Sequence, residues 1–250
     1  GMDLIVPQWP APDNVRACFT TRGGGVSQGV YQGLNLGAHV ADSLDHVRQN
    51  RTALREHLGL DSEPLWLNQV HGVDLFTLHE GEAPIEPPTA DAAMTRSTGR
   101  ALTVMTADCL PVFFCDKSGT VIATAHAGWR SLCHGVLEKS VDAMAVNPED
   151  ILVWMGPAIG PTAFEVGNEV RLAFLQQDPA AESAFKPAAL SGKWLADLWL
   201  LATQRLNAIG VTAIYGGGLC TYSDAERFYS YRRSGQRGRM SGLLWLMPKN

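Results

Sequence analysis

The sequence predicts a protein of mixed α and β structure whose strands form a mixed sheet rather than a purely parallel one. Strand-like and helix-like segments alternate along the chain, yet several neighbouring strands are separated only by short turns, such as residues 116–119. Short turns join antiparallel strands, because parallel strands need crossovers of roughly a dozen residues or more. The 250 residues suffice for one large domain or two small ones, and they contain no internal repeat or long linker.

The first half of the chain begins with residues 1–14, which we interpret as an N-terminal tail or short segment. Alternating apolar residues predict a strand over 15–21, and the glycines at 23–25 end it. Residues 44–58 predict a helix, because their apolar side chains recur on one side. Composition predicts three further segments, namely strands at 65–70 and 73–78 and a loop with three prolines at 81–90.

The second half carries the clearest strand patterns. Residues 101–106, 112–115 and 120–125 predict three consecutive strands, and 128–144 predicts a helix with a continuous apolar face. The elements that we expect after this helix are a strand at 151–155, a rigid loop at 156–161, helices at 169–176 and 194–209, and strands at 214–220 and 243–246.

Composition and charge exclude several classes of partner. Hydrophobic residues make up 46% of the chain, which is ordinary for a globular protein, but no apolar run approaches the roughly 20 residues that span a bilayer. The net charge of −5 argues against a nucleic-acid partner, because phosphate backbones bind basic surfaces. The first residues lack the pattern of a signal peptide, so we expect a cytoplasmic protein that binds neither nucleic acid nor membrane.

The five cysteines do not form a disulfide framework. Their number is odd, their spacings are wide, and no pair has the C-x-x-C spacing of a redox site or a zinc ribbon. Cys18, Cys115 and Cys133 lie in apolar patterns and are expected in the core. Cys220 ends a glycine-rich strand, so it is a candidate for the same cleft as Cys109.

Cys109 and His126 are the strongest candidates for chemistry. Asp108 precedes Cys109 and Pro111 follows it closely, so the chain turns out of the sheet there and can present the thiol as a ligand or a nucleophile. His126 ends the next predicted strand and stands just before Gly128, where small residues allow a ligand to approach the backbone. The alternative for Cys109 is a small buried hydrophobic side chain.

His71 is a third candidate at the end of a predicted strand. Two imidazoles and one thiolate would form a three-ligand zinc set with one position open, as in catalytic rather than structural zinc sites. Asn68 and Gln69 precede His71, and their amides are suited to orienting a metal ligand or a substrate. The alternative for His71 is a tight turn that merely tolerates a histidine.

Several arginines are candidates for binding an anion. Arg22 stands before the three glycines at 23–25, whose backbone N–H groups suit a phosphate, but no Gly-Lys-Ser/Thr of a P-loop follows. Any of these arginines could instead be an ordinary solvated side chain. The other candidates are Arg48 on a predicted helix, Arg130 after Gly128, and the basic run of Arg232, Arg233, Arg237 and Arg239.

Five ordered motifs together resemble the YfiH family, whose members have been called multicopper polyphenol oxidase, laccase-domain protein, purine nucleoside phosphorylase and peptidoglycan-editing factor. The resemblance runs from about residue 20 to the C-terminus. Signatures of zinc deaminases, of H-E-x-x-H metalloproteases and of G-x-S-x-G hydrolases are missing. The motifs are Asn68-Gln69-Val70-His71-Gly72, Ala107-Asp108-Cys109-Leu110-Pro111, Ala125-His126-Ala127-Gly128-Trp129-Arg130, Gly156-Pro157-Ala158-Ile159-Gly160-Pro161 and Tyr229-Ser230-Tyr231-Arg232-Arg233.

The resemblance implies an α+β fold over residues 1–250, a single domain with two mixed sheets flanked by helices in α-β-β-α layers. It implies that His71, Cys109 and His126 bind zinc and take part in catalysis. The implied reaction is phosphorolysis of adenosine, inosine, guanosine and methylthioadenosine to base and ribose 1-phosphate, with deamination of adenosine. Residue type and motif position assign nucleoside or phosphate to Arg22, Arg48, Asn68, Gln69, Asp108, Arg130 and Arg232.

Native copper oxidation fits the residues poorly. The chain has seven histidines and no His-x-His pair, whereas we expect about ten histidines in a multicopper oxidase. Copper could still occupy the site in vitro, because it outcompetes zinc for such ligands. Two other interpretations stay open: a hydrolase that edits peptidoglycan precursors with Cys109 as nucleophile and His126 as base, and a partner protein with a structural zinc that Cys220 completes.

Overall fold

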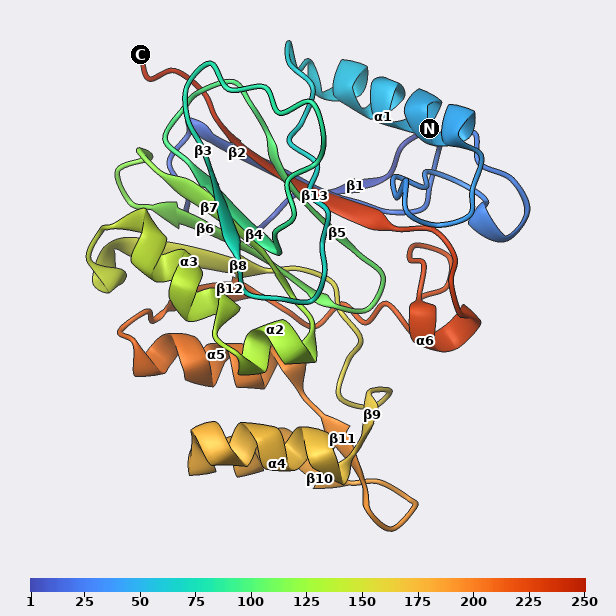
Figure 1. The fold of residues 1–250 in the computed structure, drawn as a ribbon, viewed down its shortest axis with the longest axis vertical. Coiled ribbons are helices and arrows are strands. Elements are labelled where there is room, and N and C mark those ends of the chain that lie inside the picture. The colour runs from blue at the N-terminus through green and yellow to red at the C-terminus, as the bar shows by residue number, and fades with distance from the viewer.

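The computed structural model describes all residues from 1 to 250 and contains two main β-sheets (Figure 1). Their strands are β1 Leu4–Ile5, β2 Val15–Thr20, β3 Leu75–Leu78, β4 Ala92–Thr95, β5 Leu102–Thr106, β6 Leu110–Asp116, β7 Ile122–Ala127, β8 Ile151–Met155, β12 Ala213–Gly216 and β13 Met240–Leu246. The larger sheet is mixed, with the order β12-β8-β6-β7-β4-β3 and parallel pairs at both edges. The smaller sheet, β1-β2-β13-β5, is entirely antiparallel, so the expectation that both sheets are mixed was wrong for this one.

Helices cover the outer face of each main sheet. Helix α1 (Leu44–Leu58) packs on the four-stranded sheet through a cluster that includes Leu54, Leu243 and Trp245. On the other side, α2 (Trp129–Cys133), α3 (Val136–Met144) and α5 (Leu198–Ala208) cover the six-stranded sheet (Figure 1). The layers are therefore α-β-β-α in one α+β domain, which confirms the expected fold class.

The core between the two sheets follows from the alternation of side chains along each strand. On β2, Cys18 faces α1 and Phe19 faces the opposite sheet. Phe19 and Phe113 pack against Trp154, with ring centroids 6.4 and 5.2 Å apart. This aromatic cluster fixes β6 and β8 against the second sheet, and thereby the strand ends that carry the candidate site.

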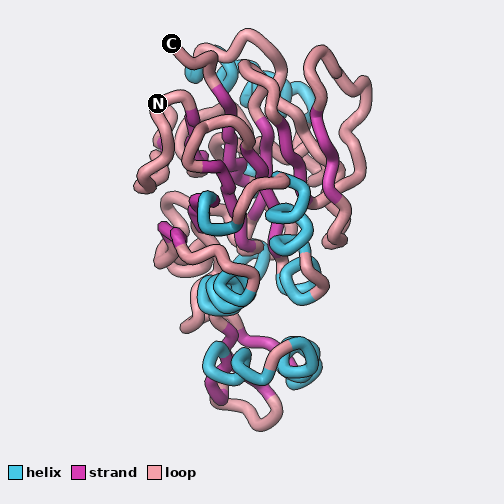
Figure 2. The backbone as a smooth tube through the Cα atoms, turned by 90° about the vertical axis from the view of Figure 1, so that its left-hand side faces the viewer, coloured by secondary structure: helices cyan, strands magenta, loops and turns pink.

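A third, three-stranded sheet was not expected from the sequence. Strands β9 (Glu165–Gly167), β10 (Phe185–Pro187) and β11 (Lys193–Ala196) pair in the order β10-β11-β9 and pack with α4 (Asn168–Gln177). We refer to residues 165–196 as the lobe. Figures 1 and 2 show that the lobe projects from the helical side of the molecule.

Four predicted elements need correction. The predicted strand at 65–70 is a loop whose only β-pairing is through isolated bridges at Leu65 and Asn68. The helix expected at 128–144 is divided into α2 and α3, because Gly135 takes a left-handed conformation with φ 102°. Asp197 starts α5 by accepting the N–H of Leu200, so the first residues of the helix expected at 194–209 form strand β11 instead. The strand expected at 214–220 ends at Gly216.

None of the helices combines the length and the apolar character that crossing a bilayer requires. The remaining short helices include α6 (Tyr231–Ser234), which lies beside the candidate site. Cys18, Cys115 and Cys133 are buried in the core, which confirms their interpretation from the sequence.

Candidate metal centre and substrate pocket

The structure brings together the three residues that the sequence singled out as metal ligands. Cys109 lies where β5 turns into β6, and His126 lies near the end of β7, opposite Pro111 of β6. His71 reaches the same point from the loop before β3. Their ligand atoms all lie within 4.8 Å of one another, and Cys109 Sγ is 4.0 Å from Nε2 of His71.

Asp91 holds two of these ligands in place. It lies directly before β4 and is almost completely buried. Its carboxylate accepts the backbone N–H groups of Val70, His71 and Gly72 at 2.9–3.0 Å, which stabilises the turn where His71 adopts φ 61°. It also lies 2.7 Å from Nδ1 of His126. Sequence reasoning missed Asp91 because it missed β4; an acidic residue directly before the apolar segment 92–94 was the available signal.

The protonation of the cluster favours a thiolate. Burial by itself raises the pKa of the Cys109 thiol, but the neighbouring His126 and hydrogen bonds from His126 and His71 outweigh burial and lower this pKa to about 6. Burial lowers the pKa of His126, but the charge of Cys109 and the hydrogen bond to Asp91 raise it overall. Thiolate is the form of cysteine that binds a metal or acts as a nucleophile.

The donor set fits a zinc ion. Separations of up to 4.8 Å are close to twice the roughly 2.0–2.3 Å of zinc–nitrogen and zinc–sulfur bonds. Because Asp91 occupies Nδ1 of His126, that ring has Nε2 available, and a carboxylate behind a histidine ligand is the usual support in zinc sites. A Cβ on Gly128 would lie 3.0 Å from Cys109 Sγ and 3.3 Å from Cδ2 of His71, so only glycine leaves this space open.

Cys220 is not part of this cluster. Its Sγ accepts the N–H of Gly160 at 3.2 Å and lies 3.4 Å from the hydroxyl of Ser223. The cluster therefore has three protein donors, the number typical of catalytic rather than structural zinc sites.

The cluster lies in a pocket of about 530 Å³ lined by apolar side chains, which we call the apolar wall, and by basic side chains, which we call the basic wall. The apolar wall comes from β5, α2, the loop after β8 and the two junctions of the lobe, and the basic wall from the loop before α1, α2, α6 and the residue before β13. The apolar lining residues include Met105, Trp129, Ile159, Phe164 and Leu198, and the basic ones are His39, Arg130, Arg232 and Arg239. The sequence analysis had singled out neither His39 nor Trp129 as a site residue.

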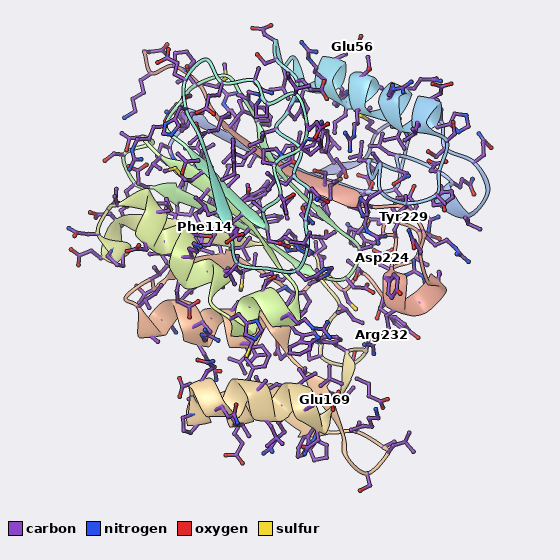
Figure 3. The ribbon with its side chains drawn as sticks, viewed as in Figure 1. Glu56, Phe114, Glu169, Asp224, Tyr229 and Arg232 are labelled. Atoms are coloured by element: carbon purple, nitrogen blue, oxygen red, sulfur yellow. The ribbon has the colours of Figure 1, made fainter.

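Asp108 connects α6 to the metal centre. It is buried and has φ 102°, a conformation that non-glycine residues rarely adopt. One carboxylate oxygen accepts the hydroxyl of Thr221 at 2.6 Å, and the other accepts the backbone N–H of Arg232 at 2.7 Å. The guanidinium of Arg232 then donates to the carbonyl of Glu165 at the edge of the lobe. Figure 3 shows Arg232 between α2 and β9.

Gln69 and Asn68 have different surroundings. The side chain of Gln69 exchanges two hydrogen bonds with the backbone of Met105, at 2.8 and 2.9 Å, and lines the pocket. It therefore fixes the His71 loop against β5. Asn68 donates to Thr89 and lies outside the pocket lining, so the structure gives it a role in the loop rather than at the site.

Four of the candidate anion-binding arginines are not in this pocket, and Arg233 and Arg237 are two of them. Arg48 lies on α1, is 73% exposed and pairs with Asp45 at 2.9 Å. Arg22 lies over the ring of Tyr229 and lines a separate cavity. Of the candidate arginines, the structure brings Arg130, Arg232 and Arg239 to the pocket that holds the metal centre.

Comparison with known proteins agrees with this geometry. Residues 16–247 match the family described as multi-copper polyphenol oxidoreductase laccase, a description that suggests metal binding. Proteins named purine nucleoside phosphorylase, from Pseudomonas aeruginosa and (as YfiH) from Escherichia coli, are 55% and 54% identical to the chain. The alignments cover 97% and 98% of the chain and 98% and 99% of those relatives. Their names support an enzymatic role.

Solved structures show the same fold. A Neisseria meningitidis protein of the family DUF152 is 47% identical, with a TM-score of 0.93 over 98% of this chain and 99% of that one. YlmD from Geobacillus stearothermophilus is 28% identical, with a TM-score of 0.84 over 98% of this chain and all of that one. The chain therefore belongs to the family described as multi-copper polyphenol oxidoreductase laccase, together with the YfiH-named purine nucleoside phosphorylases.

Proposed function

We propose that this chain is a zinc-dependent purine nucleoside phosphorylase of the cytoplasm. Its substrates would be inorganic phosphate with adenosine, inosine, guanosine or methylthioadenosine, and it would also deaminate adenosine. The observation that carries the proposal is the presence, in one pocket, of the three-donor cluster, an apolar wall and several cationic side chains. The names of the relatives support the phosphorylase part.

The apolar wall suits a purine base. Trp129 and Phe164 offer flat faces for a planar ring, and Ile159 and Leu198 add aliphatic surface. A volume of about 530 Å³ lies in the usual range for small-molecule sites and accommodates a nucleoside with a phosphate. Both junctions of the lobe contribute to this wall, so the base would be held between α2 and the lobe.

The basic wall suits phosphate. In phosphorolysis a phosphate oxygen forms a bond to C1′ of the ribose while the bond from C1′ to the base nitrogen breaks, so the anion must be held beside the sugar. Guanidinium groups bind such oxyanions through two parallel hydrogen bonds. Arg130, Arg232 and Arg239 line the pocket for this task.

His71, Cys109 and His126 would hold the zinc ion. Zinc with an open coordination position supplies a Lewis acid and lowers the pKa of water towards about 7, the chemistry that deamination needs. Asp91 would orient His126 so that the ring presents Nε2 to the ion, and Gln69 would keep the His71 loop in register with β5.

Chromatography of adenosine and inosine reactions tests this function, with and without phosphate, in parallel with metal analysis. Wild type is expected to release base only when phosphate is present, and to form inosine from adenosine without it. Cys109→Ala is expected to do neither and to bind no zinc. Base release that is independent of phosphate, or equal in Cys109→Ala, would contradict the proposal.

One observation favours a second candidate, a cysteine hydrolase acting on amides such as those of peptidoglycan precursors. Cys109, His126 and Asp91 line up as nucleophile, base and orienting carboxylate, and the pKa of Cys109 is low. Zinc on Cys109 would block this chemistry. Labelling of Cys109 by iodoacetamide in zinc-loaded protein would favour the hydrolase, whereas protection by zinc would favour the phosphorylase.

A further inference from the structure

A second concave site lies beside α6, separate from the substrate pocket. Its volume is about 180 Å³, and no carboxylate lines it. Arg22, Arg233 and Arg237 supply its charge, and Ser230 and Ser234 supply hydroxyl groups. We refer to it as the arginine pocket. Figure 3 shows Tyr229, another lining residue, beside α6 and far from Phe114 in the core.

Two of the arginines are fixed in position by neutral groups only. Arg233 donates to the carbonyl oxygens of Thr221, Tyr222 and Phe228 at 2.6–2.9 Å. Arg22 lies 4.5 Å from the ring centroid of Tyr229 and donates to the carbonyl of Ala225. Neither guanidinium pairs with a carboxylate within 4 Å, so no neighbouring acid neutralises their charge at the cavity.

The surrounding acids are engaged elsewhere. Asp224 pairs with Arg227 at 2.6 Å, and Asp108 accepts hydrogen bonds from Thr221 and Arg232. Burial lowers the pKa of Arg233 most, and the nearby charge of Arg22 lowers it further. Asp108, Tyr222 and Asp224 raise this pKa, but their effects are weaker. The chain thus places like charges at one small cavity, an arrangement that a bound anion would stabilise.

We infer that the arginine pocket is a second anion site, which binds a phosphoryl group independently of the proposed activity. Arginine is suited to bidentate contacts with tetrahedral oxyanions, and serine hydroxyls add donors that phosphate accepts. The volume suits one such group and is far below that of the substrate pocket. The phosphoryl group would come from free phosphate or from a nucleotide whose nucleoside part stays outside the cavity.

Helix α6 connects the arginine pocket to the metal centre. Arg233 of α6 lines the arginine pocket, while Tyr231 and Arg232 of the same short helix line the substrate pocket. The N–H of Arg232 is bound by Asp108, the neighbour of Cys109. An anion held by Arg233 would therefore fix the helix that forms part of the substrate pocket.

Calorimetric titration with inorganic phosphate tests the site through Ser234→Asp. This substitution puts a carboxylate beside the arginines and is expected to reduce the number of phosphate ions bound per chain by one. It should also raise the melting temperature in phosphate-free buffer, because it offsets the like charges. Ser118→Asp, on the exposed turn between β6 and β7, is the control with the same change in net charge, and it should bind phosphate as wild type does.

Arg237→Gln provides an independent variant, because the only hydrogen bond of this guanidinium is to the carbonyl of Gln236. It is expected to fold normally and to weaken phosphate binding at this site about tenfold or more. Unchanged stoichiometry in Ser234→Asp together with unchanged affinity in Arg237→Gln would overturn the inference, whatever the catalytic activity. This readout involves no turnover, so its failure is distinct from failure of the proposed phosphorylase.

A comparison of ligands identifies the source of the phosphoryl group. Titrations with phosphate, AMP and adenosine are compared between wild type and Ser234→Asp. Loss of AMP binding in the variant, with adenosine binding unchanged, assigns the site to nucleotides. Loss of phosphate binding alone assigns it to the free ion. If the substitution changes the binding of neither phosphate nor AMP, the arginine pocket binds no phosphoryl group.

Discussion

The carboxylate of Asp91 lies 2.7 Å from Nδ1 of His126 and at the same time accepts the backbone N–H of His71 at 2.9 Å. One buried side chain therefore positions two candidate metal ligands that are 55 residues apart in the sequence. Substitution of Asp91 should therefore disturb the geometry of the site while all three candidate ligands are still present.

Asp91→Asn is expected to weaken zinc binding by about 10–100-fold, because the amide is a poorer acceptor for the His126 ring and for three backbone N–H groups. Competition with a chromogenic chelator measures this affinity. Asp74→Asn is the control, since the Asp74 carboxylate is exposed and makes only a 3.6 Å contact with Lys139. Equal zinc affinity in wild type and Asp91→Asn would remove Asp91 from the site.

Gly128→Ala should reduce zinc binding without unfolding the protein. The added Cβ would lie 3.0 Å from Cys109 Sγ, closer than such atoms normally approach, and would push the thiol from its place. Gly72→Ala is the matched control, because its Cβ would have no heavy atom closer than 3.8 Å. The two variants are compared by zinc content after dialysis and by thermal melting. Full zinc content in Gly128→Ala would contradict the placement of Cys109.

Cys109→Ala is expected to lose zinc and activity together, with little loss of stability. Cys115→Ala should keep zinc and activity but lose stability. Cys115 is completely buried between the sheets, and removing its sulfur should lower the free energy of unfolding by on the order of 1 kcal/mol. Urea denaturation and metal analysis on both variants give the comparison. Unfolding of Cys109→Ala would mean that the thiol is a core group.

Arg130→Gln is expected to raise the KM for phosphate in phosphorolysis by about tenfold, because it removes a charged donor from the pocket wall. Arg48→Gln should leave KM unchanged, since Arg48 lies on α1 and pairs only with Asp45. Steady-state rates at saturating inosine distinguish the two. An effect of Arg48→Gln equal to that of Arg130→Gln would show that the pocket is not the phosphate site.

The sequence patterns predicted the parts of this structure that depend on local periodicity. Helix α1 and strands β2, β5 and β8 fall within a residue or so of the predicted ranges, because each has a regular apolar pattern. The small sheet of the lobe was missed because its strands have only three or four residues, too few for a period to show. Trp194 and Leu195 were assigned to a helix for the same reason.

The site was predictable only in part. Cys109, His71 and His126 stood out because polar groups followed apolar strands. Asp91 and His39 gave no comparable signal, because their importance comes from which strands become neighbours in space. Arg22 and Arg48 looked equivalent to Arg130 by residue type, and only the packing of α1 and of Tyr229 separates them.

The two ends of the lobe meet where it leaves the body. The N–H of Ala196 donates to the carbonyl of Phe164 at 2.9 Å, so residues 165–196 depart and return at one point. Phe164 and Leu198, on either side of that point, belong to the pocket wall, whereas the three metal-binding candidates lie on β7, at the turn between β5 and β6, and in the loop before β3. Because the lobe contributes to the pocket wall and none of the three candidate ligands, exchanging it for the lobe of a relative is expected to change which base the pocket accepts while the ligand set stays that of the recipient.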